Sequence, residues 1–227
     1  MSNRDVLVFD MDGVLAEVGD SYRESIVQTV LHFTGKTISR EAIQEYKNQG
    51  GWNNDWALSQ KICSDFGVEV SYQQVVDYFV EIFFGDGTNG LILREKWIPR
   101  DGLLERLGET FELALFTGRL RSEIAPTVQR FAPEVPFGLV VAADDVMNGK
   151  PAPDGLLQIA RLRPGVKLWY VGDTVDDARS AESAGVPFIG IAAPDVPLRD
   201  EVVALLKQHG AIAVLNDVNE IEEVLSR

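Results

Sequence analysis

Acidic side chains stand directly after short apolar runs at two places in the sequence, and a hydroxyl and an ammonium group follow two further runs. Asp10 and Asp12 come after the run at 6–9, and a Gly-Asp pair at 172–173 follows the run at 168–171. The polar residues that share this kind of position are Asp10, Asp12, Thr117, Lys150, Asp173, Asp176 and Asp177. If the runs lie side by side as strands, these side chains meet at one edge of a sheet.

Carboxylates gathered at this density repel one another unless a cation lies among them. Because the cluster offers oxygen ligands and neither histidine nor cysteine, it favours a hard ion such as Mg²⁺. Such an ion attracts a phosphate group, whose remaining oxygens Thr117 and Lys150 can hold. An aspartate beside a bound phosphate can act as a nucleophile, which predicts an aspartyl-phosphate intermediate.

The apolar runs that position these side chains predict a β-sheet. Each run is continuously apolar rather than alternating, which is typical of parallel strands buried on both faces. The runs are 6–9, 113–116, 139–142, 168–171, 188–191 and 211–214. Helical patterning separates most of them, as at 122–131, 154–162, 176–184 and 198–209. Strands that alternate with helices indicate an α/β fold with a doubly wound, mostly parallel sheet.

One segment between the first two strands is helical throughout. Its patterning predicts four helices, at 22–33, 39–48, 54–66 and 71–84. Ser71 with Gln74 predicts a capping box at the start of the fourth helix. We therefore expect two domains, an α/β core and an inserted helical domain. The core comprises residues 1–18 and 97–227, and the inserted domain comprises residues 19–96.

Composition and charge exclude several classes of partner. Lys and Arg number 21 against 35 Asp and Glu, and this formal net charge of −14 argues against a nucleic-acid or anionic-membrane binder. A small anionic substrate stays compatible, since it responds to its local pocket. The single cysteine, Cys63, can form no internal disulfide. No apolar run approaches the roughly 18 residues of a membrane span, so we expect a cytoplasmic protein.

Four motifs, in this order and each after an apolar run, resemble those of the haloacid dehalogenase-like hydrolase superfamily. They are Asp10-x-Asp12-Gly13, Thr117-Gly118, Lys150-Pro151 and Gly172-Asp173-x-x-x-Asp177. The resemblance implies that Asp10 is the nucleophile and a Mg²⁺ ligand. It implies that Asp12 is the general acid and then the general base, with its main-chain carbonyl also on the metal.

The same resemblance assigns the remaining core residues. It implies that the transferring phosphoryl group is bound by Thr117, Gly118 and Lys150. Asp173 is expected to be a direct metal ligand, and Asp177 to act on the metal directly or through water. Because Asp176 adjoins Asp177, the sequence leaves open which of the two faces the ion. It also leaves open a purely structural role for Asp177 in the first turn of a helix.

The helical insertion resembles the cap domain of this superfamily's first class, and the general layout resembles phosphoglycolate phosphatases. A cap closes over the site, excludes water and supplies substrate contacts. We interpret the stretch 49–56, with its two tryptophans and two asparagines, as a recognition loop. The candidates for substrate binding are Lys47, Trp52, Asn53 and Asn54. In the alternative, the tryptophans pack as one helical face, one asparagine is a plain N-cap and Lys47 is a surface charge.

The leading hypothesis is Mg²⁺-dependent hydrolysis of a phosphomonoester of a small metabolite. Asp12 favours phosphoryl chemistry, because the dehalogenases of this superfamily lack the second aspartate. Two alternatives stay open, namely a sugar phosphomutase on the same core and a catalytically silent phosphate-binding regulatory protein. The oligomeric state also stays open.

The stretch Gly-Gly-Trp-Asn-Asn-Asp-Trp at 50–56 also resembles a subgroup associated with histidine-biosynthesis enzymes. This resemblance makes histidinol phosphate a candidate substrate, with a tryptophan to stack on its imidazole. A dehydratase does not fit. Imidazoleglycerol-phosphate dehydratases are understood to use histidine-rich metal sites, whereas this chain has two histidines, far apart in sequence.

Overall fold

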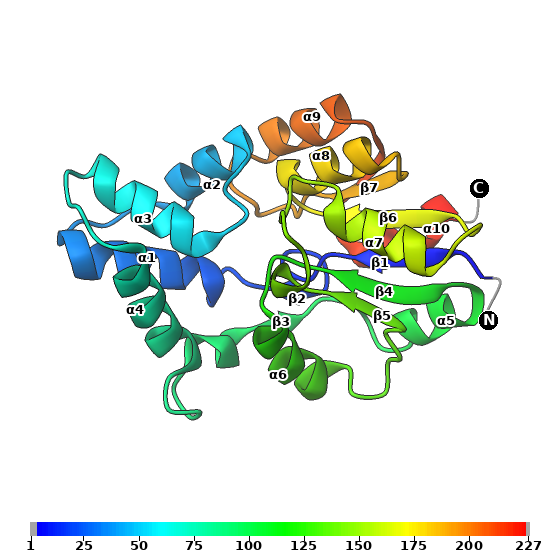
Figure 1. The fold of residues 1–227 in the computed structure, drawn as a ribbon, viewed down its shortest axis with the longest axis horizontal. Helices are drawn as coiled ribbons and strands as arrows, with labels where there is room; N and C mark the ends of the chain where they lie inside the picture. The colour runs from blue at the N-terminus through cyan, green and yellow to red at the C-terminus, as the bar shows by residue number, and fades with distance from the viewer. Residues whose placement is uncertain (1–3, 226–227) are drawn as a thin grey trace.

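The computed structural model describes residues 4–225 and shows an α/β fold built on a six-stranded sheet (Figure 1). The strands lie in the order β5-β4-β1-β6-β7-β8, and each neighbouring pair is parallel. Their bounds are β1 (Val6–Phe9), β4 (Glu112–Phe116), β5 (Leu139–Val141), β6 (Leu168–Gly172), β7 (Phe188–Ile191) and β8 (Ala211–Leu215). Each strand overlaps one apolar run of the sequence, and the predicted fold class is confirmed.

Alternate residues of the central strand β1 pack against opposite faces of the sheet. Val6 and Val8 belong to one apolar cluster, and Leu7 and Phe9 belong to the other. The first cluster is completed by α7 (Asp154–Leu162), α8 (Val175–Ala184) and α9 (Arg199–Gln208). The second is completed by α5 (Leu103–Thr110), α6 (Arg121–Phe131) and α10 (Glu222–Leu225). Because both faces of the strand are buried, the run is apolar without alternation.

Four helices form an insertion between two short strands. They are α1 (Tyr22–Thr34), α2 (Arg40–Gln49), α3 (Asp55–Asp65) and α4 (Tyr72–Phe84), each within one residue of its predicted bounds. The strands β2 (Ala16–Glu17) and β3 (Lys96–Trp97) pair antiparallel, so the two passages of the chain between sheet and insertion lie side by side. We propose that this pair marks the border between the two domains. Three short 3₁₀ turns are η1 (Leu91–Arg94), η2 (Ala143–Asp145) and η3 (Val218–Glu220).

The insertion has an apolar core of its own. Ile26 of α1 packs in it with Phe79 and Phe83 of α4. The predicted capping box at the start of α4 is present, because the backbone N–H of Gln74 donates to the Ser71 hydroxyl and the N–H of Ser71 donates to the Gln74 side chain. A separate core allows the insertion to keep its shape if its position over the sheet changes.

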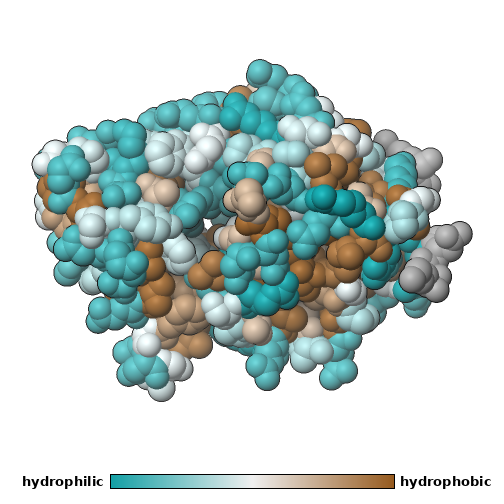
Figure 2. Space-filling model, viewed as in Figure 1, coloured by the Kyte–Doolittle hydropathy of each residue, from teal (hydrophilic) through white to brown (hydrophobic). Residues whose placement is uncertain are grey.

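The surface is hollowed where the insertion meets the sheet, and hydrophilic side chains border the hollow (Figure 2). Residues that follow β1, β4 and β6 line this pocket on the side of the sheet, and residues of α1, α2 and α3 line it on the side of the insertion. Within residues 4–225, no helix combines the length and the apolar composition needed to cross a membrane.

Candidate active site

Three neighbouring strands end at the pocket, and a polar residue is the first residue beyond each. Asp10 follows β1, Thr117 follows β4 and Asp173 follows β6. Because β4, β1 and β6 are adjacent and parallel, their carboxyl ends lie at one edge of the sheet. The fold therefore brings together residues that stand more than a hundred positions apart in the sequence.

Lys150 is a buried cation at this edge. Its Nζ lies 2.8 Å from Oδ1 of Asp10 and 2.7 Å from Oδ1 of Asp177. Burial alone lowers the pKa of Lys150, but the two carboxylates more than offset this effect, so its pKa lies above the usual value and the ammonium stays charged. An ammonium held in this way can also donate to the oxygens of an incoming phosphoryl group.

Asp10, Asp173 and Asp177 form an acidic cluster in which one oxygen of each lies within 4.8 Å of the others. Burial raises the pKa of Asp10 to about 7, against the opposing effect of Lys150. Burial, reinforced by Asp177 and Asp10, raises the pKa of Asp173 well above its usual value. Oδ1 of Asp173 is buried and accepts no hydrogen bond from the described residues. A divalent cation would supply the missing positive partner, so these oxygen ligands fit Mg²⁺.

Within this cluster, several hydrogen-bond donors hold the carboxylate of Asp177 in place. The hydroxyls of Tyr170 and Thr174 each donate to it at 2.6 Å, in addition to the ion pair with Lys150. Burial raises the pKa of Asp177, but Lys150 and the two hydroxyls more than offset this, and its pKa lies below the usual value. The carboxylate is therefore charged, and both of its oxygens already accept hydrogen bonds.

Asp176 points away from the cluster and towards the insertion. It accepts a hydrogen bond of 2.7 Å from the backbone N–H of Gly51. Close by, the Arg179 guanidinium donates to the carbonyl of Gln49 at 3.3 Å. Asp177 therefore lies in the acidic cluster beside Lys150, whereas Asp176 joins α8 to the loop that precedes α3.

The strand-end residues after β4 also contact both parts of the molecule. Thr117 is buried, and its hydroxyl accepts a hydrogen bond from the Arg119 N–H at 3.2 Å. A Cβ atom at Gly118 would lie 2.3 Å from Nδ2 of Asn53, too close for any real contact. The Asn53 side chain therefore occupies the space beside Gly118, and a larger residue at this position would displace its amide.

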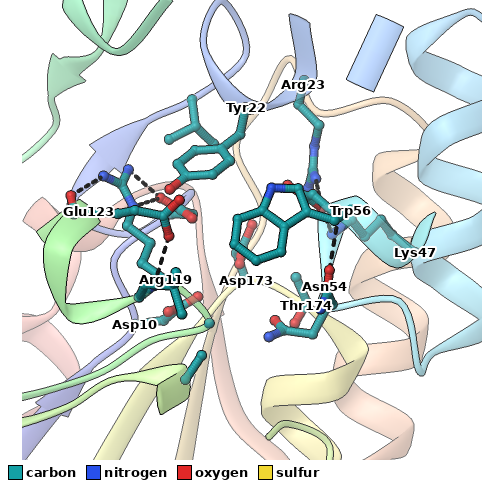
Figure 3. Close-up of a pocket in the computed structure, with 17 residues that line it drawn as sticks. Asp10, Tyr22, Arg23, Lys47, Asn54, Trp56, Arg119, Glu123, Asp173 and Thr174 are labelled. Atoms are coloured by element: carbon teal, nitrogen blue, oxygen red, sulfur yellow. Dashed lines mark hydrogen bonds and ion pairs between the residues drawn. The ribbon is translucent and has the colours of Figure 1, made fainter. Parts of the chain in front are cut away.

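One wall of the pocket comes from the insertion and the other from the sheet domain (Figure 3). The insertion contributes Val18, Tyr22, Arg23, Lys47, Asn53, Asn54, Asp55 and Trp56 to this lining. The Trp56 ring lies across the middle of the view, between Tyr22 and Asn54. Lys47 forms an ion pair with Asp55, whose carboxylate also lies 3.8 Å from an Arg23 nitrogen.

Three of the four residues predicted from the insertion line the pocket, namely Lys47, Asn53 and Asn54. Asn54 is also the N-cap of α3, because it accepts hydrogen bonds from the first-turn N–H groups. Trp52 lies outside the pocket lining and packs against the insertion's own core. Trp56 is the tryptophan that presents its ring to the pocket.

Asp12 pairs with Arg119, for which the sequence predicted no role. Arg119 donates from Nε and Nη2 to Oδ1 of Asp12, at 2.8 and 2.5 Å, and from Nη2 to Glu95 at 2.7 Å. Burial lowers the pKa of Arg119, but Asp12, Tyr22 and Glu95 more than offset this, so the guanidinium stays charged. Arg119 follows Thr117-Gly118 directly and could have been noticed there. No local pattern marks Glu95, because its contact depends on the fold.

Glu123 is a further acidic residue of the pocket that the sequence did not predict. It is buried, and it accepts a hydrogen bond of 2.7 Å from the Leu120 N–H at the start of α6. Burial raises its pKa to about 7, while the Leu120 N–H and Arg119 oppose this rise. Near neutral pH, the pocket therefore contains a carboxyl group that is only partly ionised.

These groups together can bind and transfer a tetrahedral anion. Lys150 and a cation on the acidic cluster would neutralise its charge. Asp10 lies in this field and can act as a nucleophile. The side chain of Asp12 lines the same pocket and can exchange a proton with the anion's leaving group.

Comparison with known proteins identifies the family. The profile of the haloacid dehalogenase-like hydrolases matches residues 7–191. An imidazoleglycerol-phosphate dehydratase of Phytophthora nicotianae is 32% identical over 226 residues, which cover 92% of this chain and 49% of that protein. A phosphoglycolate phosphatase of Escherichia coli K12 is 35% identical over 82 residues, which cover 35% of this chain and 32% of that protein. The chain thus spans half or less of the length of these relatives.

A solved structure shares the fold from end to end. A predicted phosphoglycolate phosphatase from Haemophilus somnus 129pt superimposes with a TM-score of 0.74 at 17% identity, over 99% of each chain. At this identity the likeness shows the fold alone, whereas the family profile covers most of the sequence. The chain therefore belongs to the haloacid dehalogenase-like hydrolases, and its helical insertion is a cap of the family's first class.

Proposed function

We propose that this protein is a Mg²⁺-dependent phosphatase, which hydrolyses a phosphomonoester of a small metabolite through an aspartyl-phosphate on Asp10. The observation that carries this proposal is the position of Lys150 between Asp10 and Asp177, beside the unpartnered oxygen of Asp173. This set of charges suits one dianionic phosphoryl group. The name of the Escherichia coli relative supports the same reaction class.

In the first half of the reaction, a carboxylate oxygen of Asp10 attacks phosphorus, and the bond from phosphorus to the ester oxygen breaks. Asp12 gives a proton to the departing oxygen, so the alcohol leaves as a neutral molecule. We assign the binding of the phosphoryl oxygens to Thr117, Gly118 and Lys150, through a hydroxyl, a backbone N–H and an ammonium.

In the second half, Asp12 is a carboxylate and takes a proton from water. The water oxygen attacks the phosphorus of the aspartyl-phosphate, the bond from phosphorus to Asp10 breaks, and inorganic phosphate leaves. The insertion lies over the site and limits the access of bulk water.

The metal-holding residues follow from the acidic cluster. Asp10, Asp173 and the main-chain carbonyl of Asp12 would hold Mg²⁺ directly. Asp177 would act through water, because both of its oxygens already accept hydrogen bonds. When bound, Mg²⁺ neutralises the charge of the phosphoryl group and of its nucleophile.

The insertion would recognise the alcohol part of the substrate. Trp56 offers a ring, and Lys47 and Asn53 offer donors, on the pocket wall opposite the strand ends. Trp52, the tryptophan predicted for this role, would support the loop by packing. Histidinol phosphate is one candidate substrate, since its imidazole could stack on Trp56.

We do not extend the dehydratase name of the Phytophthora relative to this chain. The two histidines of this chain, His32 and His209, both lie outside the pocket lining. His32 stacks on Tyr78 in the insertion, and His209 pairs with Glu182 of α8.

The proposal is tested by measuring phosphate release from a panel of phosphomonoesters that includes phosphoglycolate, histidinol phosphate and hexose phosphates. Each ester is assayed with Mg²⁺, with a chelator, and with the variant Asp10→Asn. We expect release from at least one ester that needs both the metal and Asp10. Asp65→Asn, which removes an exposed carboxylate paired with Lys61, is the matched control and should keep full activity.

Two outcomes would overturn the proposal. Unchanged release by Asp10→Asn would remove Asp10 as the nucleophile. Interconversion of hexose phosphates without phosphate release would identify a phosphomutase instead.

A further inference from the structure

Arg119 is buried beside the proposed general acid, yet the mechanism above gives it no task. Its side chain is 1% exposed, although its guanidinium always carries a charge. Asp12 receives hydrogen bonds from two of its nitrogens, Nε and Nη2. Both reach the same carboxylate oxygen, Oδ1, which leaves Oδ2 available for proton exchange.

The other contacts of Arg119 fix the plane of the guanidinium. Glu95 accepts from Nη2 at 2.7 Å, and Thr127 accepts from Nη1 at 2.8 Å. Thr127 in turn donates to the second oxygen of Glu95 at 2.7 Å. The ring of Tyr22 lies against the guanidinium, 4.7 Å from its carbon. Arg119 thus has partners along its edge and on its face.

Two of these partners, Tyr22 and Glu95, come from the ends of the insertion. Tyr22 is the first residue of α1, and Glu95 lies between η1 and β3, directly before the chain returns to the sheet domain. Arg119 and Thr127 belong to the sheet domain, before and within α6. The contact network therefore joins Asp12 to both passages of the chain between the two parts of the molecule.

Stability alone is a weak reason for such a cluster. Removing the charged groups of Arg119 and Glu95 from water is costly, and apolar residues of similar volume often stabilise a fold equally well. The cluster does supply one well-defined orientation of a carboxylate, which a proton donor needs.

We propose that Arg119 is a positioning residue, which holds Asp12 in the orientation for proton transfer and, through Glu95 and Tyr22, ties that orientation to the placement of the insertion. This inference rests on the proposed phosphatase function. It concerns one half-reaction most directly, the protonation of the leaving oxygen.

The test compares two esters that differ in their need for an acid. An alkyl phosphate needs a proton on its leaving oxygen, whereas 4-nitrophenyl phosphate releases an oxyanion that is stable without one. Alcohol release is measured in a single turnover with enzyme in excess, so the later attack of water does not enter. In Arg119→Gln we expect alkyl release to fall about 10²-fold or more, and nitrophenol release to fall less than about 10-fold.

Two variants calibrate this ratio. Asp12→Asn removes the acid itself and should change the ratio of the two rates in the same direction. Arg163→Gln removes an Arg–Glu pair, with Glu112, far from the site, and should leave both rates unchanged. Arg119→Lys should recover only part of the alkyl rate, because an ammonium lacks the planar fork that holds Asp12 and Glu95 together.

Glu95→Gln provides a second test, should Arg119→Gln fail to fold. This variant keeps the Arg119 guanidinium on Asp12 but weakens the contact with residue 95 that holds the guanidinium in place. We expect the release rate from the alkyl ester to fall selectively, by less than in Arg119→Gln. Equal slowing of both esters in these variants would show a merely structural role and overturn the inference. Failure of the proposed function looks different, because wild-type protein and Asp10→Asn would then release alcohol at equal rates.

Discussion

Asp176 and Asp177 show how two identical neighbours acquire different roles at the scale of single residues. Thr174 is the N-cap of α8, and its hydroxyl accepts a hydrogen bond from the Asp177 N–H. In return, Asp177 accepts from the backbone N–H of Thr174, so this capping box turns its carboxylate back towards the strand end. Asp176, one position earlier in the first turn, is directed to the insertion, where it meets Gly51. The motif spacing alone does not separate these two directions.

The first prediction concerns Glu123, whose burial raises its pKa from 4.5 to about 7. A carboxyl group with a raised pKa in the folded state stabilises the protein fully below pH 4.5 and loses that contribution as the pH rises to about 7. We therefore expect Glu123→Gln, which stays neutral, to gain stability relative to wild type across this range, by about 3 kcal/mol at pH 8. Urea unfolding at pH 4.5 and pH 8 measures the difference.

Glu105→Gln serves as the control for Glu123, because it changes an exposed glutamate in the first turn of α5. A stability difference between Glu123→Gln and wild type that is the same at both pH values would contradict the account.

At the scale of elements, the six strands of the sheet and eight of the helices could be predicted, because the signal for each lies within its own residues. The short elements β2, β3, α5 and α10 were not predicted. The apolar runs gave the strands, and the capping box at Ser71 gave the start of α4 to within one residue. Contacts between elements were not predictable in this way. Gly51 and Asp176 are 125 residues apart, and their hydrogen bond depends on how the insertion sits on α8. The choice of Trp56 over Trp52 depends on the same placement.

The second prediction tests this contact between the insertion and α8. Asp176→Ala removes the acceptor of the Gly51 N–H, a charge-assisted hydrogen bond worth roughly 1.5–3 kcal/mol. Amide exchange at Gly51 should therefore accelerate by roughly 10- to 100-fold, as measured by hydrogen exchange with NMR detection. Asp200→Ala changes an exposed acid in the first turn of α9 and should leave Gly51 unaffected. Unchanged protection of Gly51 in Asp176→Ala would show that other contacts hold the loop.

At the scale of the whole molecule, we expect the acidic cluster to make the stability of the fold depend on a bound cation. The protein carries a net charge of −14, and three of its carboxylates lie within 4.8 Å of one another around one lysine. A ligand that binds only the folded protein stabilises it, by about 2.7 kcal/mol at a hundredfold excess over its Kd. If Mg²⁺ binds as proposed, we expect metal binding and folding stability to be linked through Asp10 and Asp173.

The third prediction is that Mg²⁺, at a concentration about a hundredfold above its Kd, raises the melting temperature of a chain of this size by about 5–10 °C. Asp173→Asn should melt at a higher temperature than wild type in chelator, because it relieves repulsion, and should respond little to Mg²⁺. Differential scanning calorimetry in MgCl₂ and in EDTA measures both effects. An equal response to Mg²⁺ in wild type and Asp173→Asn would place the metal elsewhere.

The proposed aspartyl-phosphate is tested by identifying the residue that carries the phosphoryl group during turnover. Protein mixed with the best ester and Mg²⁺ is quenched during turnover and treated with borohydride, which reduces an aspartyl-phosphate to homoserine. We expect homoserine at position 10 by peptide mass spectrometry, and none in Asp10→Asn or in samples without ester. Turnover with an unmodified Asp10, or reduction at another aspartate, would contradict the proposal.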